Sequence, residues 1–307
     1  MRGLAVFVCM VAALGLVLTG VAEAKRATDK LFDASLTYVG KSENDSSSSD
    51  TEIQRTVLTL GGKYPIPIAK KHLLMIGLDY SGQFVSYDNF TPSTPPGFGG
   101  QQITEDDMPD SLHSIHVPVT FVATWTEQWN TVFQVSPGIQ SDFEDLSDDD
   151  VITTAMVLAQ YKFGKNDIVG FGAAFSDAFG SLGLLPVLKL YWYPTEQWYV
   201  EAFLPFDLDV GYVFSEQLSA GLEGKLRGYQ YRLSEDQPWD NKVLRFREVR
   251  IGPFVDYAIT EKAHLRASVG AVTAQKFEIR DDDNDDKLVD GDYENTYYAT
   301  VNFFIPF

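Results

Sequence analysis

The chain has 307 residues, with 24 Lys and Arg against 43 Asp and Glu, so its formal charge is −19. Hydrophobic residues make up 45% and aromatic residues 13%, which is too apolar for a disordered acidic tail. The acidity excludes nucleic acid as an expected partner, because phosphate binding needs clustered Lys and Arg. Cys9 is the single cysteine, so neither a disulfide framework nor a cysteine-ligated metal site is expected, and no cofactor is predicted.

The first 24 residues read as a secretory signal peptide. Arg2 precedes an apolar run that ends at Ala22, and Ala22-Glu23-Ala24 forms a small-x-small cleavage pattern. The alternative is an uncleaved membrane anchor, since the run is long enough to span a bilayer. The cleavage pattern favours a mature protein that starts at Lys25, with residues 25–307 forming one domain.

Strict alternation of apolar and polar residues dominates the rest of the chain. From Trp198 to Phe214 every second residue is apolar, and the other parity carries Glu201, Asp207 and Asp209. Such alternation over long stretches predicts strands with one apolar and one polar face. In chain order the predicted strands are 31–40, 51–63, 73–87, 112–125, 129–141, 152–163, 168–177, 184–193, 198–204, 207–214, 218–231, 243–257, 264–279 and 294–306.

Two architectures use such strands, a soluble sandwich and a transmembrane barrel, and the barrel turns its apolar face outward to lipid. Many of the predicted strands reach the length of about 9–11 residues that crosses a bilayer at a tilt. Short connections such as 126–128 and 195–197 alternate with long ones such as 88–110 and 281–292, as in bacterial outer-membrane barrels. Tryptophans flank the short turns, which suits an interfacial aromatic belt. The sequence therefore favours an all-β, antiparallel, up-and-down transmembrane barrel.

The strand count depends on residues 198–214. Unbroken parity suits one strand, but that gives an odd total, whereas single-chain bacterial barrels have even counts. Pro205 favours a tight hairpin, which gives about fourteen strands, and twelve is the alternative. Prolines inside other predicted strands, at 118, 137, 186 and 253, are expected to mark bulges or kinks.

The signal peptide, the amphipathic strands and a last strand that ends in Phe307 resemble Gram-negative outer-membrane β-barrel proteins, in particular barrel families of unknown function. This resemblance implies an outer-membrane location, contact with outer-membrane lipid and lipopolysaccharide, and recognition by the barrel-assembly machinery through the terminal strand. It implies no catalytic residues.

Charged residues on the lumen-facing parity are the candidate site. They either form a constriction that selects charged solutes or pair with one another and fill the interior. The main candidates are Glu223, Lys225, Arg227, Glu248, Arg250 and Arg266, and Asp256, Lys276 and Glu278 are expected on the same lumen-facing parity. On the opposite parity, Arg245 and Arg247 are expected at the rim, where they can contact lipopolysaccharide phosphates.

An enzyme is not expected. The one His and Ser cluster contains His113 and His116, which are three residues apart and so point to opposite faces of a strand. The acidic run 281–286 departs from the spacing of calcium loops, because Asp286 stands where a glycine is needed, and we expect a solvated loop. The predicted function is a channel for a small solute; the alternatives are a structural or surface-binding barrel with a filled lumen and, less favoured, a lipid hydrolase.

Overall fold

The computed structural model describes residues 30–45, 51–69, 71–90, 104–147, 150–176, 183–234, 242–282 and 285–307. The predicted signal peptide lies outside these residues. Within them, no helix is long and apolar enough to cross a membrane.

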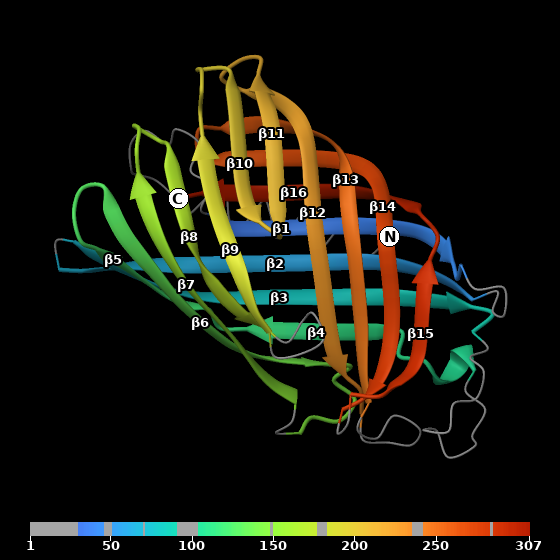
Figure 1. Cartoon of the computed structure of the whole chain (residues 1–307). Helices are drawn as coiled ribbons and strands as arrows, with labels where there is room; N and C mark the ends of the chain where they lie inside the picture. Colours follow the sequence, from blue (N-terminus) through green and yellow to red (C-terminus); the bar gives the residue numbers. More distant parts are fainter. Residues whose placement is uncertain are drawn as a thin grey trace.

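Antiparallel strands follow one another around a closed barrel (Figure 1). Consecutive wall strands pair with each other, and the terminal strand pairs with the first, so the wall closes on itself. The strands are β1 (Lys30–Glu43), β2 (Glu52–Ile68), β3 (His72–Asp88), β4 (Ser111–His116), β5 (Val119–Thr124), β6 (Trp129–Ser141), β7 (Val151–Lys162), β8 (Ile168–Ser176), β9 (Gly183–Trp192), β10 (Trp198–Leu204), β11 (Asp207–Val213), β12 (Leu218–Arg232), β13 (Lys242–Thr260), β14 (Ala263–Asp281), β15 (Lys287–Tyr293) and β16 (Thr296–Pro306). A short 3₁₀ turn, Glu105–Asp107, lies between β3 and β4.

These segments form fourteen wall strands, because two wall strands are each interrupted once. β4 and β5 both pair with β3 and β6 and are separated only by Val117 and Pro118. β15 and β16 both pair with β14, on its outer and inner parts. The predicted count of about fourteen is confirmed, and the alternative of twelve is wrong.

The hairpin expected at Pro205 is present. β10 and β11 pair from Trp198 with Tyr212 to Phe203 with Asp207, and the turn between them is Pro205-Phe206. With seven residues each, these are much shorter than β13 and β14, which have 19. The hairpin therefore pairs only with the short-turn end of β12, from Ser219 to Lys225.

Two details of the sequence prediction are wrong. Residues 287–293, expected inside a long loop, form β15. The prolines at 137, 186 and 253 sit in regular pairing without a register shift, with their side chains facing outward, so the bulges expected at them are not formed. Only Pro118 accompanies an interruption, and its carbonyl still accepts a hydrogen bond from the Gly77 N–H, at 2.8 Å.

The exterior of the barrel is apolar, as a lipid-facing surface requires. Leu222 is 62% exposed and Val269 56%, and both belong to the apolar parity of their strands. The opposite parity carries the charged and polar residues and is largely buried. This inversion of the usual soluble pattern decides for a membrane barrel over a sandwich.

The short turns share one geometry. The side-chain oxygens of Thr126 and Thr195 accept the N–H of the residue three positions on, each at 3.0 Å, and Ser215 does the same at 3.1 Å. The backbone N–H groups of Trp129 and Trp198 donate two of these bonds. Both tryptophan side chains are exposed, at the end of the barrel that carries the short turns. The Thr/Ser-Glu-Gln sequence therefore recurs because it forms the same hydrogen-bonded turn each time, and it does not indicate a repeat protein.

At the end with the long loops, opposite parts of the wall touch. Arg232 of β12 forms a parallel bridge with Ser141 of β6, although seven wall strands lie between β12 and β6 on one side and five on the other. The Ser234 N–H also donates to the Asp142 carboxylate, at 2.9 Å. In Figure 1, β12, β13 and β14 bend toward the end of β6. The barrel is therefore pinched at its long-loop end, which is the outer end in this class of protein.

Candidate functional site

The lumen-facing charges lie on the strands that the period-two pattern selects. Glu223, Lys225 and Arg227 alternate along β12, and Glu248 and Arg250 alternate along the neighbouring strand β13. Arg266 lies on β14 and pairs in register with Asp256 of β13. All six residues thus line one side of the barrel interior, where five fall into three groups and Arg227 pairs separately. Lys276 and Glu278 do not face the lumen as expected, because a bulge at Ala274 shifts the faces of β14 beyond it.

The outermost group is centred on Glu248, which is 0% exposed. Arg250 donates to it through Nε at 2.6 Å, and Arg55 of β2 forms the second ion pair. β2 and β13 are separated along the wall by β14, β16 and β1, so the pair with Arg55 spans the lumen. Arg55 also lies over the Phe246 ring, with 4.5 Å from its guanidinium carbon to the ring centroid.

The middle group is centred on Glu223. Lys225 Nζ lies 2.9 Å from one carboxylate oxygen, and the Tyr298 hydroxyl of β16 donates to the other at 3.0 Å. Tyr298 is itself buried, and the Arg250 guanidinium lies near its ring face, 5.9 Å from the centroid. The middle and outermost groups are therefore continuous.

The innermost group is centred on Arg266. It forms ion pairs with Asp209 of β11 and with Asp256, the latter at 3.3 Å, and its guanidinium lies 4.2 Å from the centre of the Phe254 ring. His264 Nδ1 lies 3.1 Å from the other oxygen of Asp256. Arg227 does not join this group but pairs with Asp207 at 2.7 Å, beside the β10–β11 turn.

These three groups and the Arg227–Asp207 pair balance their charges. Five cations, Arg55, Lys225, Arg227, Arg250 and Arg266, face five carboxylates, Asp207, Asp209, Glu223, Glu248 and Asp256. Neutral pairing is what buried charges require, because an unpaired charge away from water is very costly.

The sequence prediction of the site missed Arg55, Asp207 and Asp209. Both aspartates stand out as charges on the lumen-facing parity of a strongly alternating segment. Arg55 carries the same signal on β2, where it follows Ile53 and precedes Val57 on one face. The alternation of one strand does not predict that Arg55 pairs with Glu248, because these residues are 193 positions apart in the chain.

An apolar cluster fills the lumen beyond these charges, toward the pinched end. It joins β2, β3, β4, β12, β13 and β14, and side chains from opposite walls meet in it. The Tyr231 hydroxyl of β12 accepts a hydrogen bond from Gln83 of β3, at 2.8 Å. Among its members are Ile53, Tyr87, Leu112, Tyr231, Leu244, Phe246, Phe277 and Ile279.

The inner part of the lumen is different. Asp33, Lys63, Asp79 and Asp207 face inward there and are only half-buried. The lumen therefore has an inner section whose polar side chains reach water and an outer section from which water is excluded.

The histidines of β4 lie on opposite sides of the wall, as the spacing predicts. His113 contacts the Tyr80 hydroxyl, at 2.9 Å, next to the outward-facing ring of Phe84. His116 faces the lumen, where its Nε2 lies 2.9 Å from Gln140 Nε2. The two cannot share one site. Among the described residues, no group of three or more His, Cys, Asp or Glu side chains is arranged to hold a metal ion.

Three aspartates at the end of β14 and just beyond it form ion pairs that the sequence does not predict. Asp281 pairs with Lys242 at 3.1 Å, Asp282 with Arg232, and Asp285 with Arg245 at 2.8 Å. The expectation of a loosely solvated loop is wrong for these three aspartates, because strand ends from β12 and β13 supply matching cations.

Residues 31–305 match the family model described as a domain of unknown function, DUF6268. The chain belongs to this family. The resemblance to outer-membrane barrels of unknown function is thereby confirmed at the level of family and fold. No curated protein matches the DUF6268 chain.

Solved outer-membrane channels are loosely similar to the DUF6268 chain. The toluene transporter TodX of Pseudomonas putida is 13% identical, with 92% of this chain and 90% of that chain covered and a TM-score of 0.45. A TodX deletion mutant, described as a monoaromatic hydrocarbon channel, is 11% identical, with 90% and 89% covered and a TM-score of 0.47. An outer membrane channel from Pseudomonas putida F1 is 11% identical, with 94% and 100% covered and a TM-score of 0.42. Structural similarity with TM-scores this low carries no information about a solute of this chain.

Proposed function

We propose that this protein is an outer-membrane channel for a small solute and that the conformation described here is its closed state. The observation that carries the proposal is the two-part lumen. Half-buried charged residues line the inner section, whereas the outer section is closed by side chains that meet across the lumen. A water-filled inner section with a side-chain closure at one end is the arrangement of a gated pore.

The second candidate is a structural or surface-binding barrel that transports nothing. The balanced pairing around Glu248 and Glu223 favours it, because a neutral network also serves as interior filling. The two candidates differ in whether the closure can be removed to leave a conducting pore.

The test is single-channel conductance in a planar bilayer, with wild type and the variant Tyr231→Ala/Phe246→Ala. Both side chains belong to the apolar closure, and Tyr231 also makes the Gln83 contact across the lumen. We expect wild type to show rare openings and the variant to conduct at least about tenfold more often, because each truncation removes a ring from the constriction. The matched control is Phe171→Ala/Leu184→Ala, which truncates two exposed outward-facing side chains.

Absence of conductance in both wild type and the closure variant, with both folded as judged by heat-modifiable gel mobility, would assign the protein to the filled-barrel class. A wild-type protein that conducts permanently would support the channel function but contradict the proposal that the described conformation is closed.

A further inference from the structure

The outward faces of β13 and β14 change from apolar to cationic at one level, where Arg247 and Lys276 pair in register. On β13 the outward residues Val255 and Ile251 are 47% and 53% exposed, and Arg247 and Arg245 follow on the same face toward the outer end. On β14 the change falls at Ala274, whose φ of 48° marks a bulge. Beyond it Lys276 and Arg280 face outward, whereas Phe277 and Ile279 turn into the lumen cluster. Successive outward residues are about 7 Å apart along a strand, so the arginines begin close to the edge of the lipid-facing band.

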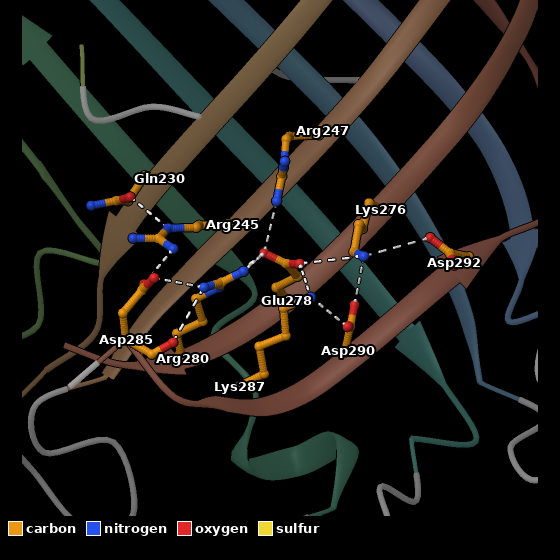
Figure 2. Close-up of polar contacts among 10 residues, drawn as sticks. All are labelled: Gln230, Arg245, Arg247, Lys276, Glu278, Arg280, Asp285, Lys287, Asp290 and Asp292. Carbon is orange, nitrogen blue, oxygen red and sulfur yellow. Dashed lines mark hydrogen bonds and ion pairs between the residues drawn. The ribbon is translucent and has the colours of Figure 1, made fainter. Parts of the chain in front are cut away.

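Figure 2 shows how these side chains are held together. Glu278, which is only 1% exposed, accepts ion pairs from Arg247 at 3.0 Å, Arg280 at 3.0 Å, Lys287 at 3.1 Å and Lys276 at 3.5 Å. We name as the rim cluster the six cations Arg232, Arg245, Arg247, Lys276, Arg280 and Lys287.

The rim cluster is cationic in an otherwise strongly acidic chain. Its six cations pair with five carboxylates, Glu278, Asp282, Asp285, Asp290 and Asp292, whereas the whole chain carries −19. The carboxylate at its centre is buried, but the side chains of Lys287 and Arg247 remain 40% and 32% exposed. Pairs with the exposed carboxylates contribute about 0–1 kcal/mol each, so a phosphate can displace them at little cost.

We propose that the rim cluster binds the phosphate groups of lipopolysaccharide in the outer leaflet. Arginine presents a planar fork that fits phosphate oxygens, and lysine adds a mobile point charge. The cluster lies beside the apolar band, at the height where phosphates of the lipid headgroups meet the barrel. A site for a free anion has no reason to adjoin the apolar band. A lipid requires this position, because its phosphates contact the rim cluster while its acyl chains pack on Ile251 and Val269.

The inference rests on the outer-membrane location that forms part of the proposed function, but not on transport. A barrel that never conducts can still bind the lipid, so the conductance test and the lipid test fail independently.

The experiment measures retention of bisphosphoryl lipid A by the detergent-purified full chain in native mass spectrometry. Dephosphorylated lipid A is the comparison ligand, and excess inorganic phosphate is the competitor. The test variant is Arg247→Gln/Lys276→Gln, which leaves Arg280 and Lys287 on the buried Glu278. The matched control is Lys162→Gln/Lys165→Gln, which removes two exposed charges at the short-turn end.

We expect the wild type and the control variant to retain bisphosphoryl lipid A at least about tenfold better than the test variant, a difference of about 1.4 kcal/mol. Equal retention by the test variant would overturn the proposal. Equal retention of the dephosphorylated lipid would mean that acyl contacts alone hold it. Displacement by inorganic phosphate would mean a free-anion site. Either result would also overturn the proposal. Native gel mobility identical to wild type shows that the variants are folded.

Discussion

Replacing Glu248 with alanine is expected to lower the free energy of unfolding by about 3–5 kcal/mol, because it leaves two arginines buried without a counter-charge. Arg55 and Arg250 are both almost fully buried, and Glu248 holds both of them through ion pairs. The measurement is urea-induced unfolding in lipid vesicles, followed by tryptophan fluorescence. The control is Glu216→Ala in an exposed short turn, where we expect a change below about 0.5 kcal/mol.

A second variant separates pairing from packing. In Arg55→Met/Glu248→Leu/Arg250→Met the whole charged group is replaced by apolar side chains of similar volume, and most of the lost stability should return. If Glu248→Ala is instead as stable as wild type, water reaches the two arginines and the outer lumen is not closed.

Ile251→Arg is expected to cost about 2–4 kcal/mol in folding into the bilayer, because position 251 faces hydrocarbon. Its neighbour Arg250 is a natural arginine on the same strand, but it faces the lumen and pairs with Glu248. A shift of one residue along β13 therefore decides whether an arginine is tolerated. The fraction of heat-modifiable folded protein in vesicles measures the effect.

The control for Ile251→Arg is Glu261→Arg, in the exposed turn between β13 and β14. This variant introduces arginine outside the membrane and should fold like wild type. Equal folding of both variants would show that the exposed apolar face of β13 does not contact lipid.

Much of this fold can be predicted from the sequence, because a barrel strand is a local pattern. The alternation around Trp198–Phe214, with Pro205 between its halves, predicts the hairpin and the even strand count. Lumen charges such as Glu223 and Arg250 follow from the same parity. β15 escapes prediction because its seven residues, Lys287–Tyr293, include Lys287, Asp290, Gly291 and Asp292 and so show little apolar alternation. The bulge at Ala274 separately inverts the faces of β14 beyond it.

The closure of the lumen could not be predicted in the same way. Arg55 and Glu248, or Gln83 and Tyr231, meet only because the outer end of the barrel is pinched. Strand alternation specifies which face a side chain takes but not which residue stands opposite it across the lumen. Likewise, the parity of Arg247 predicts a rim position, whereas its contact with Glu278 depends on the bulge in β14.

The most direct test of the closed outer mouth is a disulfide between β6 and β12. Ser141 and Arg232 are bridge partners. The Cα atoms of paired residues in neighbouring strands lie about 5 Å apart, within the range that a disulfide spans. Cys9 is the only native cysteine. The variant Ser141→Cys/Arg232→Cys should therefore cross-link on oxidation, and any channel openings should return only after reduction. The control Ser136→Cys/Ser219→Cys places cysteines on the inner parts of the same two strands, where no bridge joins them, and should stay reduced. Failure of the first pair to cross-link, or openings that are unaffected by the cross-link, would contradict the closure.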